Sequence, residues 1–522
     1  MRYKHFSLVP FMTIIILVGI IPYWDVITKG FYLGESFGGF VNAIQSPFFA
    51  LFALVNNGPE YFNYCRPMTE VLYKIQYIVF GIRPAFFHLV SVLLNGLNAG
   101  LLFLLVIRIT GMKQMGFLAG LLFALNPLHS EPVSWLIANN IMLCTFFFLA
   151  ALVVFDDYMK YGKAASYCAA LLFEILALLS HEAGVVLPGV LLLYDFLWGH
   201  PGLKARIKTH LPFLVVLAFY FMLRFIMLGG LGDNGMILHA DVWVYLKEVF
   251  IYIPFDFVYP VNREVFTSDP LYIFWISTSV LVVLLFIRRR EIKNDYKVLL
   301  FSLCLILVPC LPYFGLLGIQ KNLWNSRYFY LSSSGFCIFL SWLLMAAIKG
   351  ASYAAPRVTL VAILITGFYG FILYTNNQAW SGASIRMRAV YNDLDNIIAY
   401  ARRDEVVFIL DPPPLYKGAR FICCGYWAID KMLSKPGKDL FLVPVTTKND
   451  SEITDEKQQM RIYNLSHIKF LIPDFQRDAH YSKAAEILSG AKTPEGLNMN
   501  AVLVRWDERT MHLSVLENYG FR

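Results

Sequence analysis

The chain has 522 residues, of which 58% are hydrophobic and only 15% are charged. Soluble domains are about 45–50% apolar and about 25% charged, so the composition excludes an ordinary soluble protein and predicts a multi-pass membrane protein. The net charge of +8 does not indicate nucleic-acid binding, because the basic residues form no stripe with interleaved stacking aromatics.

The N-terminal segment has a basic lead and then an apolar core, without an A-x-A-like cleavage site. We expect a retained signal anchor that forms the first span. Since a span needs about 20 mainly apolar residues, the sequence predicts about eleven transmembrane helices. They cover residues 6–23, 84–109, 114–128, 139–156, 165–180, 183–198, 211–229, 270–288, 297–316, 328–348 and 357–375.

Basic residues recur in every second loop, which is the positive-inside pattern and predicts a cytoplasmic N-terminus. The cytoplasmic loops then hold Arg108, Lys113, Lys160, Lys163, Lys204, Arg206, Lys208, Arg288, Arg289, Arg290, Lys293, Lys297, Lys349 and Arg357. With this orientation, the polar interruptions of the apolar runs fall on the extracytoplasmic side.

The first outer loop, residues 24–83, is too long for a simple connector. Within it, residues 48–55 and 71–80 are predicted to be amphipathic segments at the outer interface. The tail is less apolar, with β-branched or aromatic runs at 405–410, 439–445, 468–473 and 501–506. These runs predict strands of a small extracytoplasmic α/β domain. We therefore expect a transmembrane domain at 1–375 and this second domain at 376–522.

The eight cysteines have no zinc-ligand spacing, and most lie in apolar runs. They are interpreted as small hydrophobic residues and not as a disulfide framework.

The most informative interruption is residues 125–143, where His129 and Glu131 lie between two prolines inside an apolar region. An unpaired polar group in lipid costs several kcal/mol, so such a break indicates contact with water, protein or a ligand. A second break holds His181 and Glu182, and Asp25 directly follows the first span.

Arg66 and Arg327, with Tyr328 beside it, complete the predicted outer-face site. Each of these residues also has a structural interpretation. Asp25 could cap a turn, Arg66 could be an interfacial anchor, and Arg327 with Tyr328 could belong to an aromatic belt. His129 and Glu131 could bond one another, and His181 with Glu182 could simply begin a helix.

A metal site is a further alternative, since Asp25, His129, Glu131, His181 and Glu182 offer oxygen and nitrogen ligands for a divalent ion. Neither His-Glu pair has a recognised ligand spacing. We therefore predict no metal and no soluble cofactor.

Six runs of the sequence form a recognisable series: Arg66-Pro67-Met68-Thr69, residues 86–95 (FFHLVSVLLN), Asn126-Pro127-Leu128-His129-Ser130-Glu131, residues 180–184 (SHEAG), Leu193-Tyr194-Asp195 and residues 327–336 (RYFYLSSSGF). In these runs the chain resembles the GT-C membrane glycosyltransferases, and among these the protein O-mannosyltransferases with tetratricopeptide repeats and their bacterial relatives. The resemblance covers roughly residues 6–350.

The resemblance implies a GT-C fold and transfer of a sugar from a polyprenyl-phosphate donor to a protein, lipid or polysaccharide acceptor on the outer face. It implies that Asp25 is the general base and that Arg66 and Arg327 bind the donor phosphate. His129, Glu131, His181, Glu182 and Tyr328 would line the site. A base opposite the leaving group would invert the anomeric centre.

The chain departs from the family in having Val26 after Asp25, where paired acidic residues are usual, and His181 where lysine is common. A catalytically inactive scaffold or glycan-binding relative therefore remains an alternative, as does a transporter of polyprenyl-linked glycans. If Asp25 is not the base, Glu35, Glu60 and Glu70 lie in the same loop. No tetratricopeptide array follows, which favours a bacterial inner membrane.

Overall fold

The computed structural model describes residues 8–33, 36, 66–199, 202–228, 242–266, 271–287, 291–313, 317, 321–348, 354–400, 405–410, 413, 415–421, 429, 433, 440–446, 460–465, 468–473 and 501–515. The predicted segment at 48–55 and the alternative bases Glu35 and Glu60 lie outside these ranges.

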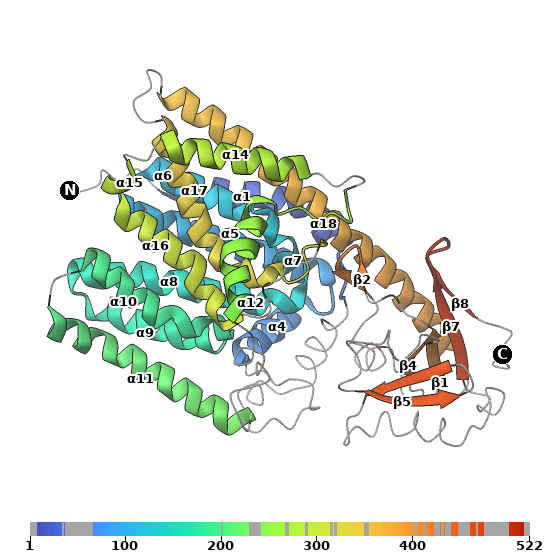
Figure 1. Cartoon of the computed structure of the whole chain (residues 1–522). Helices are drawn as coiled ribbons and strands as arrows, with labels where there is room; N and C mark the ends of the chain where they lie inside the picture. Colours follow the sequence, from blue (N-terminus) through green and yellow to red (C-terminus); the bar gives the residue numbers. More distant parts are fainter. Residues whose placement is uncertain are drawn as a thin grey trace. The chain divides into compact units, whose positions relative to one another are not determined.

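Apolar helices form most of the described chain (Figure 1). The N-terminal ones are α1 (Val9–Ile20), η1 (Ile21–Tyr23), α2 (Trp24–Lys29), α4 (Pro67–Phe80), α5 (Pro84–Thr110), α6 (Lys113–Ala124), η3 (Pro127–His129), α7 (Ser130–Ser134), η4 (Leu136–Ala138), α8 (Asn139–Tyr161) and α9 (Ala164–Leu178). There follow η5 (Glu182–Val186), α10 (Leu187–Trp198), α11 (Leu203–Leu228), α12 (Val242–Lys247), the π-helix η7 (Glu248–Tyr252), α13 (Ile253–Val258), α14 (Leu271–Ile287), α15 (Glu291–Asn294), α16 (Tyr296–Leu307), η8 (Val308–Tyr313), η9 (Ser326–Phe329), α17 (Ser332–Ile348) and α18 (Ala354–Tyr400).

Among the described residues, five helical stretches are long and apolar enough to cross a membrane. They are Val9–Lys29, Pro84–Thr110, Leu136–Tyr161, Leu203–Ile226 and Tyr296–Tyr313. The chain is therefore a multi-pass membrane protein, and the count of eleven spans stays a prediction. The helix that contains the predicted span 357–375 is α18, which continues to Tyr400.

Small residues let helices approach closely, as is usual where lipid provides no hydrophobic drive for association. In α17, a methyl group added at Gly335 would lie 2.7 Å from Ile306 N of α16 and 2.8 Å from the carbonyl carbon of Leu305. In α6, one added at Gly120 would lie 2.7 Å from the Ile15 side chain of α1. The pairs α16–α17 and α1–α6 consequently pack together.

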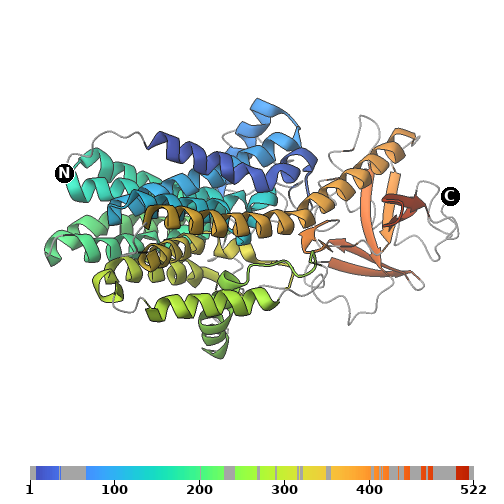
Figure 2. The same cartoon turned by 90° about the horizontal axis from the view of Figure 1, so that it is seen from above.

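The four predicted strand segments are confirmed as β1 (Glu405–Leu410), β4 (Leu440–Thr446), β6 (Ile468–Pro473) and β7 (Ala501–Asp507). The sheet order is β5-β6-β4-β1-β7-β8, with β5 at Met460–Leu465 and β8 at His512–Val515. Strand β1 pairs in parallel with β4 and β7, and the outer pairs are antiparallel. These strands, orange to red, gather in both views (Figures 1 and 2). A separate hairpin joins β2 (Leu415–Tyr416) to β3 (Ala419–Arg420).

The chain divides into two compact units. Unit 1 is Met1–Thr28, Tyr64–Leu72 and Ala85–Ala379, and unit 2 is Lys29–Asn63, Tyr73–Pro84 and Trp380–Arg522. Within unit 2, Arg386 Nε donates to Glu508 Oε1 over 2.7 Å, and His512 Nδ1 lies 3.0 Å from Asp393 Oδ1. The predicted domain boundary after residue 375 stays a prediction, because unit 2 also takes in parts of the first outer loop.

Replacing Gly335 by alanine should lower the thermal stability of the detergent-solubilised chain, since the added methyl group meets the α16 backbone. Overpacking of this kind typically costs about 1–3 kcal/mol. Gly367→Ala in α18 is the matched control, because a Cβ there meets no atom within 4 Å. An unfolding midpoint for Gly335→Ala equal to that of Gly367→Ala would contradict the close α16–α17 packing.

Candidate functional site

The break after α6 is a compact polar turn inside unit 1. Asn126 caps it, because its side-chain oxygen accepts a hydrogen bond from Leu128 N over 3.0 Å, and Pro127 then begins η3. His129 and Glu131 are 0% and 1% exposed. The two polar residues that the sequence singles out are thus enclosed by protein and not by lipid.

Glu131 is held by Arg327, which lies 196 residues later in the chain. Arg327 Nη1 is 2.5 Å from Glu131 Oε1, while Arg327 N and Ser326 Oγ donate to Oε2 over 3.0 and 3.2 Å. Burial acts to lower the pKa of Arg327, but the Glu131 carboxylate outweighs it and raises that pKa above its usual value. The arginine is therefore a permanent cation with a fixed orientation.

Aromatic rings surround the Arg327 guanidinium. Its central carbon lies 4.5 Å from the ring centroid of Tyr328, 4.9 Å from that of Trp324 and 5.3 Å from that of Trp135. The preceding turn is strained, since Leu323 and Asn325 have φ of 62° and 77°. For leucine this left-handed conformation is costly and survives only where the surroundings impose it. Trp324 lies between these two residues, beside a guanidinium that is 19% exposed.

The second break holds another carboxylate, Glu182, which is paired with arginines as Glu131 is. Glu182 Oε2 accepts from Arg66 Nε and Nη2 over 3.0 and 2.7 Å, and Oε1 accepts from Arg224 Nη1 over 3.0 Å. Burial acts to raise the pKa of Glu182, but the neighbouring groups, Arg66 above all, outweigh burial and lower that pKa below its usual range. Glu182 is thus ionised and holds two arginines.

His181 is the N-cap residue of η5 and is neutral. Its Nδ1 accepts from Ala183 N over 3.2 Å, so the ring proton belongs on Nε2. Burial, and next the charge of Arg66, lowers the pKa of His181 to about 3.

Two tyrosines join the Glu131 and Glu182 centres. Tyr313 Oη is 2.9 Å from His181 Nδ1, the Tyr313 and Tyr328 rings stack at 4.6 Å, and Tyr328 Oη accepts from Arg327 Nη2 over 3.0 Å. The result is one continuous cluster, which we call the arginine cluster, made of Arg66, Glu131, His181, Glu182, Arg224, Tyr313, Arg327 and Tyr328. Its three guanidiniums against two carboxylates leave one excess positive charge.

His129 is placed differently from Glu131, and the two do not form the pair considered from the sequence. Its Nε2 lies 2.7 Å from Ser333 Oγ, and its ring packs against Phe123 and Tyr330 at 4.6 and 4.4 Å. These contacts give His129 a packing role, and a site-lining role for it stays a prediction.

Asp25 lies in the first turn of α2 and is partly exposed. Gln378 Nε2 donates to Asp25 Oδ2 over 3.4 Å. Just before it, the buried Tyr23 donates through Oη to His129 O over 3.2 Å. The turn that carries Asp25 therefore contacts the central break through Tyr23. The residues of the arginine cluster, in contrast, contact one another directly through their side chains.

Sequence reasoning missed Arg224, Tyr313 and the run Asn376-Asn377-Gln378. The sequence does mark Arg224 and the three amides as unusual. Arg224 interrupts the apolar run FYFMLRFIML, and the amides directly follow a predicted apolar span. An ionisable residue in such a run is functional or paired by default. Nothing in the sequence marks Tyr313 as unusual, because tyrosines are common near membrane interfaces.

The described ranges contain no group of three or more histidine, cysteine, aspartate or glutamate side chains arranged to hold a metal ion. Glu131 and Glu182 are instead paired with arginines.

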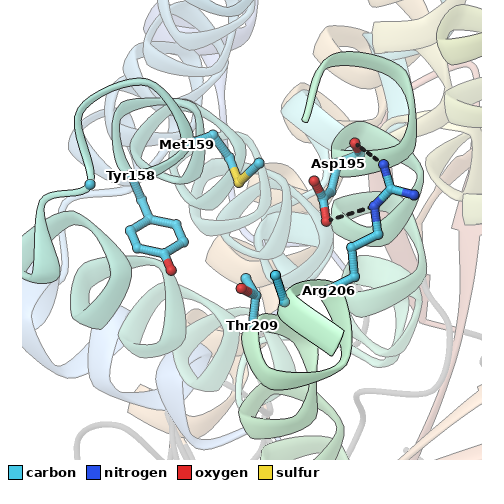
Figure 3. Close-up of a pocket in the computed structure, with 7 residues that line it drawn as sticks. Tyr158, Met159, Asp195, Arg206 and Thr209 are labelled. Atoms are coloured by element: carbon cyan, nitrogen blue, oxygen red, sulfur yellow. Dashed lines mark hydrogen bonds and ion pairs between the residues drawn. The ribbon is translucent and has the colours of Figure 1, made fainter. Parts of the chain in front are cut away.

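A pocket of about 240 Å³ lies among residues outside the arginine cluster (Figure 3). Tyr158, Met159, Asp195, Arg206 and Thr209 line it, and Asp195 points toward Arg206. Asp195 Oδ2 is 3.4 Å from Arg206 Nε and 3.2 Å from His210 Nε2. These contacts give the Leu193-Tyr194-Asp195 motif a structural role in joining α10 to α11.

The histidine predicts a pH dependence of stability. His181 has an ordinary pKa of 6.5 when unfolded and about 3 when folded, so below pH 6.5 the unfolded chain binds a proton that the folded chain does not. Stability should therefore fall as the pH falls. His181→Gln should reduce that slope between pH 6.5 and 5 by up to about 1.4 kcal/mol per pH unit. Unfolding midpoints across that range test this, and an unchanged slope would refute the neutral buried histidine.

No protein-family model matches the chain. Among curated proteins, it is 22% identical over 325 residues to the mouse protein O-mannosyl-transferase TMTC3, which covers 53% of this chain and 35% of that protein. It is 22% identical over 391 residues to F38B6.6 of Caenorhabditis elegans, which covers 69% of this chain and 55% of that protein. It is 31% identical over 139 residues to tmtc2 of Xenopus laevis, which covers 25% of this chain and 16% of that protein. Both are also named protein O-mannosyl-transferases. The chain spans about a third of the length of the mouse relative.

Two solved structures resemble the chain weakly. ArnT from Cupriavidus metallidurans in the apo state aligns with a TM-score of 0.48 at 12% identity, over 89% of this chain and 98% of that one. The Archaeoglobus fulgidus oligosaccharyltransferase aligns with a TM-score of 0.48 at 12% identity, over 89% of this chain and 73% of that one. The sequence relatives do confirm the resemblance: the chain is similar to protein O-mannosyl-transferases.

Proposed function

We propose that this chain is a GT-C type glycosyltransferase that moves a sugar from a polyprenyl-phosphate donor to an acceptor hydroxyl on the extracytoplasmic side. The observation that carries the proposal is the arginine cluster, which has excess positive charge and is held at two polar breaks of an apolar bundle. The relatives' names make a mannosyl group the first sugar to assay and a protein hydroxyl the first acceptor. The proposed location is a bacterial inner membrane.

The reaction needs a proton acceptor and a cationic site for the leaving phosphate. We assign proton removal to Asp25, whose carboxylate takes the hydroxyl proton as the acceptor oxygen bonds to the anomeric carbon. The bond between that carbon and the phosphate oxygen breaks, and polyprenyl phosphate leaves with the electron pair. Attack from the face opposite the phosphate inverts the anomeric centre.

Arg66 and Arg327 are assigned to the departing phosphate. Each is ion-paired and partly exposed, with side chains 22% and 19% accessible. A guanidinium that a carboxylate already orients needs little rearrangement when phosphate charge develops, which is the condition for electrostatic catalysis. Its planar fork also matches two phosphate oxygens. No metal or soluble cofactor is required in this scheme.

Asp25→Asn tests the base. It should lower turnover of a polyprenyl-phosphate-mannose donor by about 10²- to 10⁴-fold, because a positioned base contributes a factor of this size. Donor binding, measured separately by titration, should stay within about 2-fold, since Asp25 does not contact the phosphate in this scheme. Glu70→Gln in the same outer loop is the control. Turnover that survives Asp25→Asn and fails in Glu70→Gln would move the base to Glu70.

Arg327→Lys tests the phosphate site while keeping a cation beside Glu131. The loss of the bidentate fork should weaken donor binding by about 10-fold or more, with a smaller effect on acceptor KM. Arg108→Lys is a matched control, because Arg108 also pairs with carboxylates, Asp156 and Asp157, outside the arginine cluster. Equal donor affinities in the two variants would remove Arg327 from the phosphate site.

A further inference from the structure

Three consecutive amide side chains, Asn376, Asn377 and Gln378, lie inside α18, and we call them the amide triad. Asparagine is a poor helix former, because its side chain competes for backbone hydrogen bonds. Both asparagines are nevertheless 0% exposed. Their place in the middle of a helix therefore requires compensating contacts.

Asn376 joins two segments that are far apart in the sequence. Its Nδ2 donates to Pro127 O over 3.3 Å and to Pro260 O over 3.0 Å, and its Oδ1 accepts from Asn262 N over 2.9 Å. The side chain uses both its donor and its acceptor groups. It thereby holds the central break against the segment that follows α13.

Asn377 likewise joins two distant segments, one of which is the turn that leads to Asp25. Its Nδ2 donates to Pro22 O over 2.9 Å, and its Oδ1 accepts from Ser134 Oγ over 3.4 Å. One side chain thus ties the end of the first span to α7, which begins one residue before Glu131.

Gln378 contacts the carboxylate itself. Its Nε2 lies 3.4 Å from Asp25 Oδ2 and 3.4 Å from Tyr374 O, one turn earlier in α18. These distances are long for N–H···O hydrogen bonds, but catalytic contacts are often long before substrate binds and tighten in the reacting complex. Unlike the two asparagines, Gln378 is partly exposed.

We infer that the amide triad is a positioning element for Asp25, an inference that rests on the proposed function. Asn376 and Asn377 fix the backbone before Asp25 relative to the break that holds Glu131, and Gln378 sets the orientation of the carboxylate. Such fixing matters, because a base misplaced by about 1 Å can cost about 10²-fold in rate.

The test compares Gln378→Ala with Thr375→Ala in the full-length chain, assayed with polyprenyl-phosphate-mannose and a peptide acceptor. Thr375 is the matched control, because its hydroxyl donates to Phe371 O within its own helix. Gln378→Ala should lower kcat by about 10-fold with donor KM and unfolding midpoint unchanged, since loss of a bond to a charged group has this size. Thr375→Ala should leave all three unchanged.

Gln378→Glu provides an independent arm, because it places a negative charge beside Asp25. It should lower kcat more than Gln378→Ala does. If both variants turn over like wild type while Asp25→Asn is inactive, the positioning role is overturned and the proposed function stands. If Asp25→Asn keeps wild-type turnover, Asp25 is not the base, and the positioning role that depends on it is overturned as well.

A second measurement does not depend on turnover. Hydrogen–deuterium exchange of the amides in Trp24–Lys29 should become faster in Asn377→Ala than in wild type, because Pro22 loses its donor. Thr375→Ala should leave that exchange unchanged. Equal exchange in Asn377→Ala and wild type would overturn the inference even in a preparation without activity.

Discussion

The architecture of unit 1 depends on one constraint: a carboxylate removed from water must be matched by a cation and by hydrogen-bond donors. Glu131 meets this requirement with Arg327 N, Arg327 Nη1 and Ser326 Oγ, and Glu182 meets it with Arg66 and Arg224. Because each partner comes from a distant part of the chain, these pairs fix which helix ends meet. The fold and the proposed site therefore share the same interactions.

Those pairs also explain how a cationic site can exist among apolar helices. An unpaired guanidinium there would be costly, whereas a guanidinium already bonded to a carboxylate keeps its orientation and part of its charge. The stacked Tyr313 and Tyr328 rings add apolar contact without interrupting the polar connection. In the proposed function, a site built in this way needs little rearrangement when the donor phosphate binds.

The sequence predicted what local composition controls. The apolar runs, the breaks at His129 and His181, and the strands β1, β4, β6 and β7 all carry their own periodicity or polarity. Partner choice could not be predicted in the same way. Nothing near Glu131 indicates that its partner is Arg327 and not His129, because that pairing follows from how η9 packs on α7. Arg224 and Asn377 likewise acquire their roles only through segments more than 40 residues away.

Arg224 has a consequence for how the bundle is assembled. It is the last charged residue of the apolar α11. A lone arginine deep in a membrane helix costs about 2.5–3.5 kcal/mol on translocon-based scales. Its partner Glu182 is synthesised 42 residues earlier. The acidic group is therefore synthesised before the helix that carries the arginine, and we expect stable insertion of α11 to depend on the helices made before it.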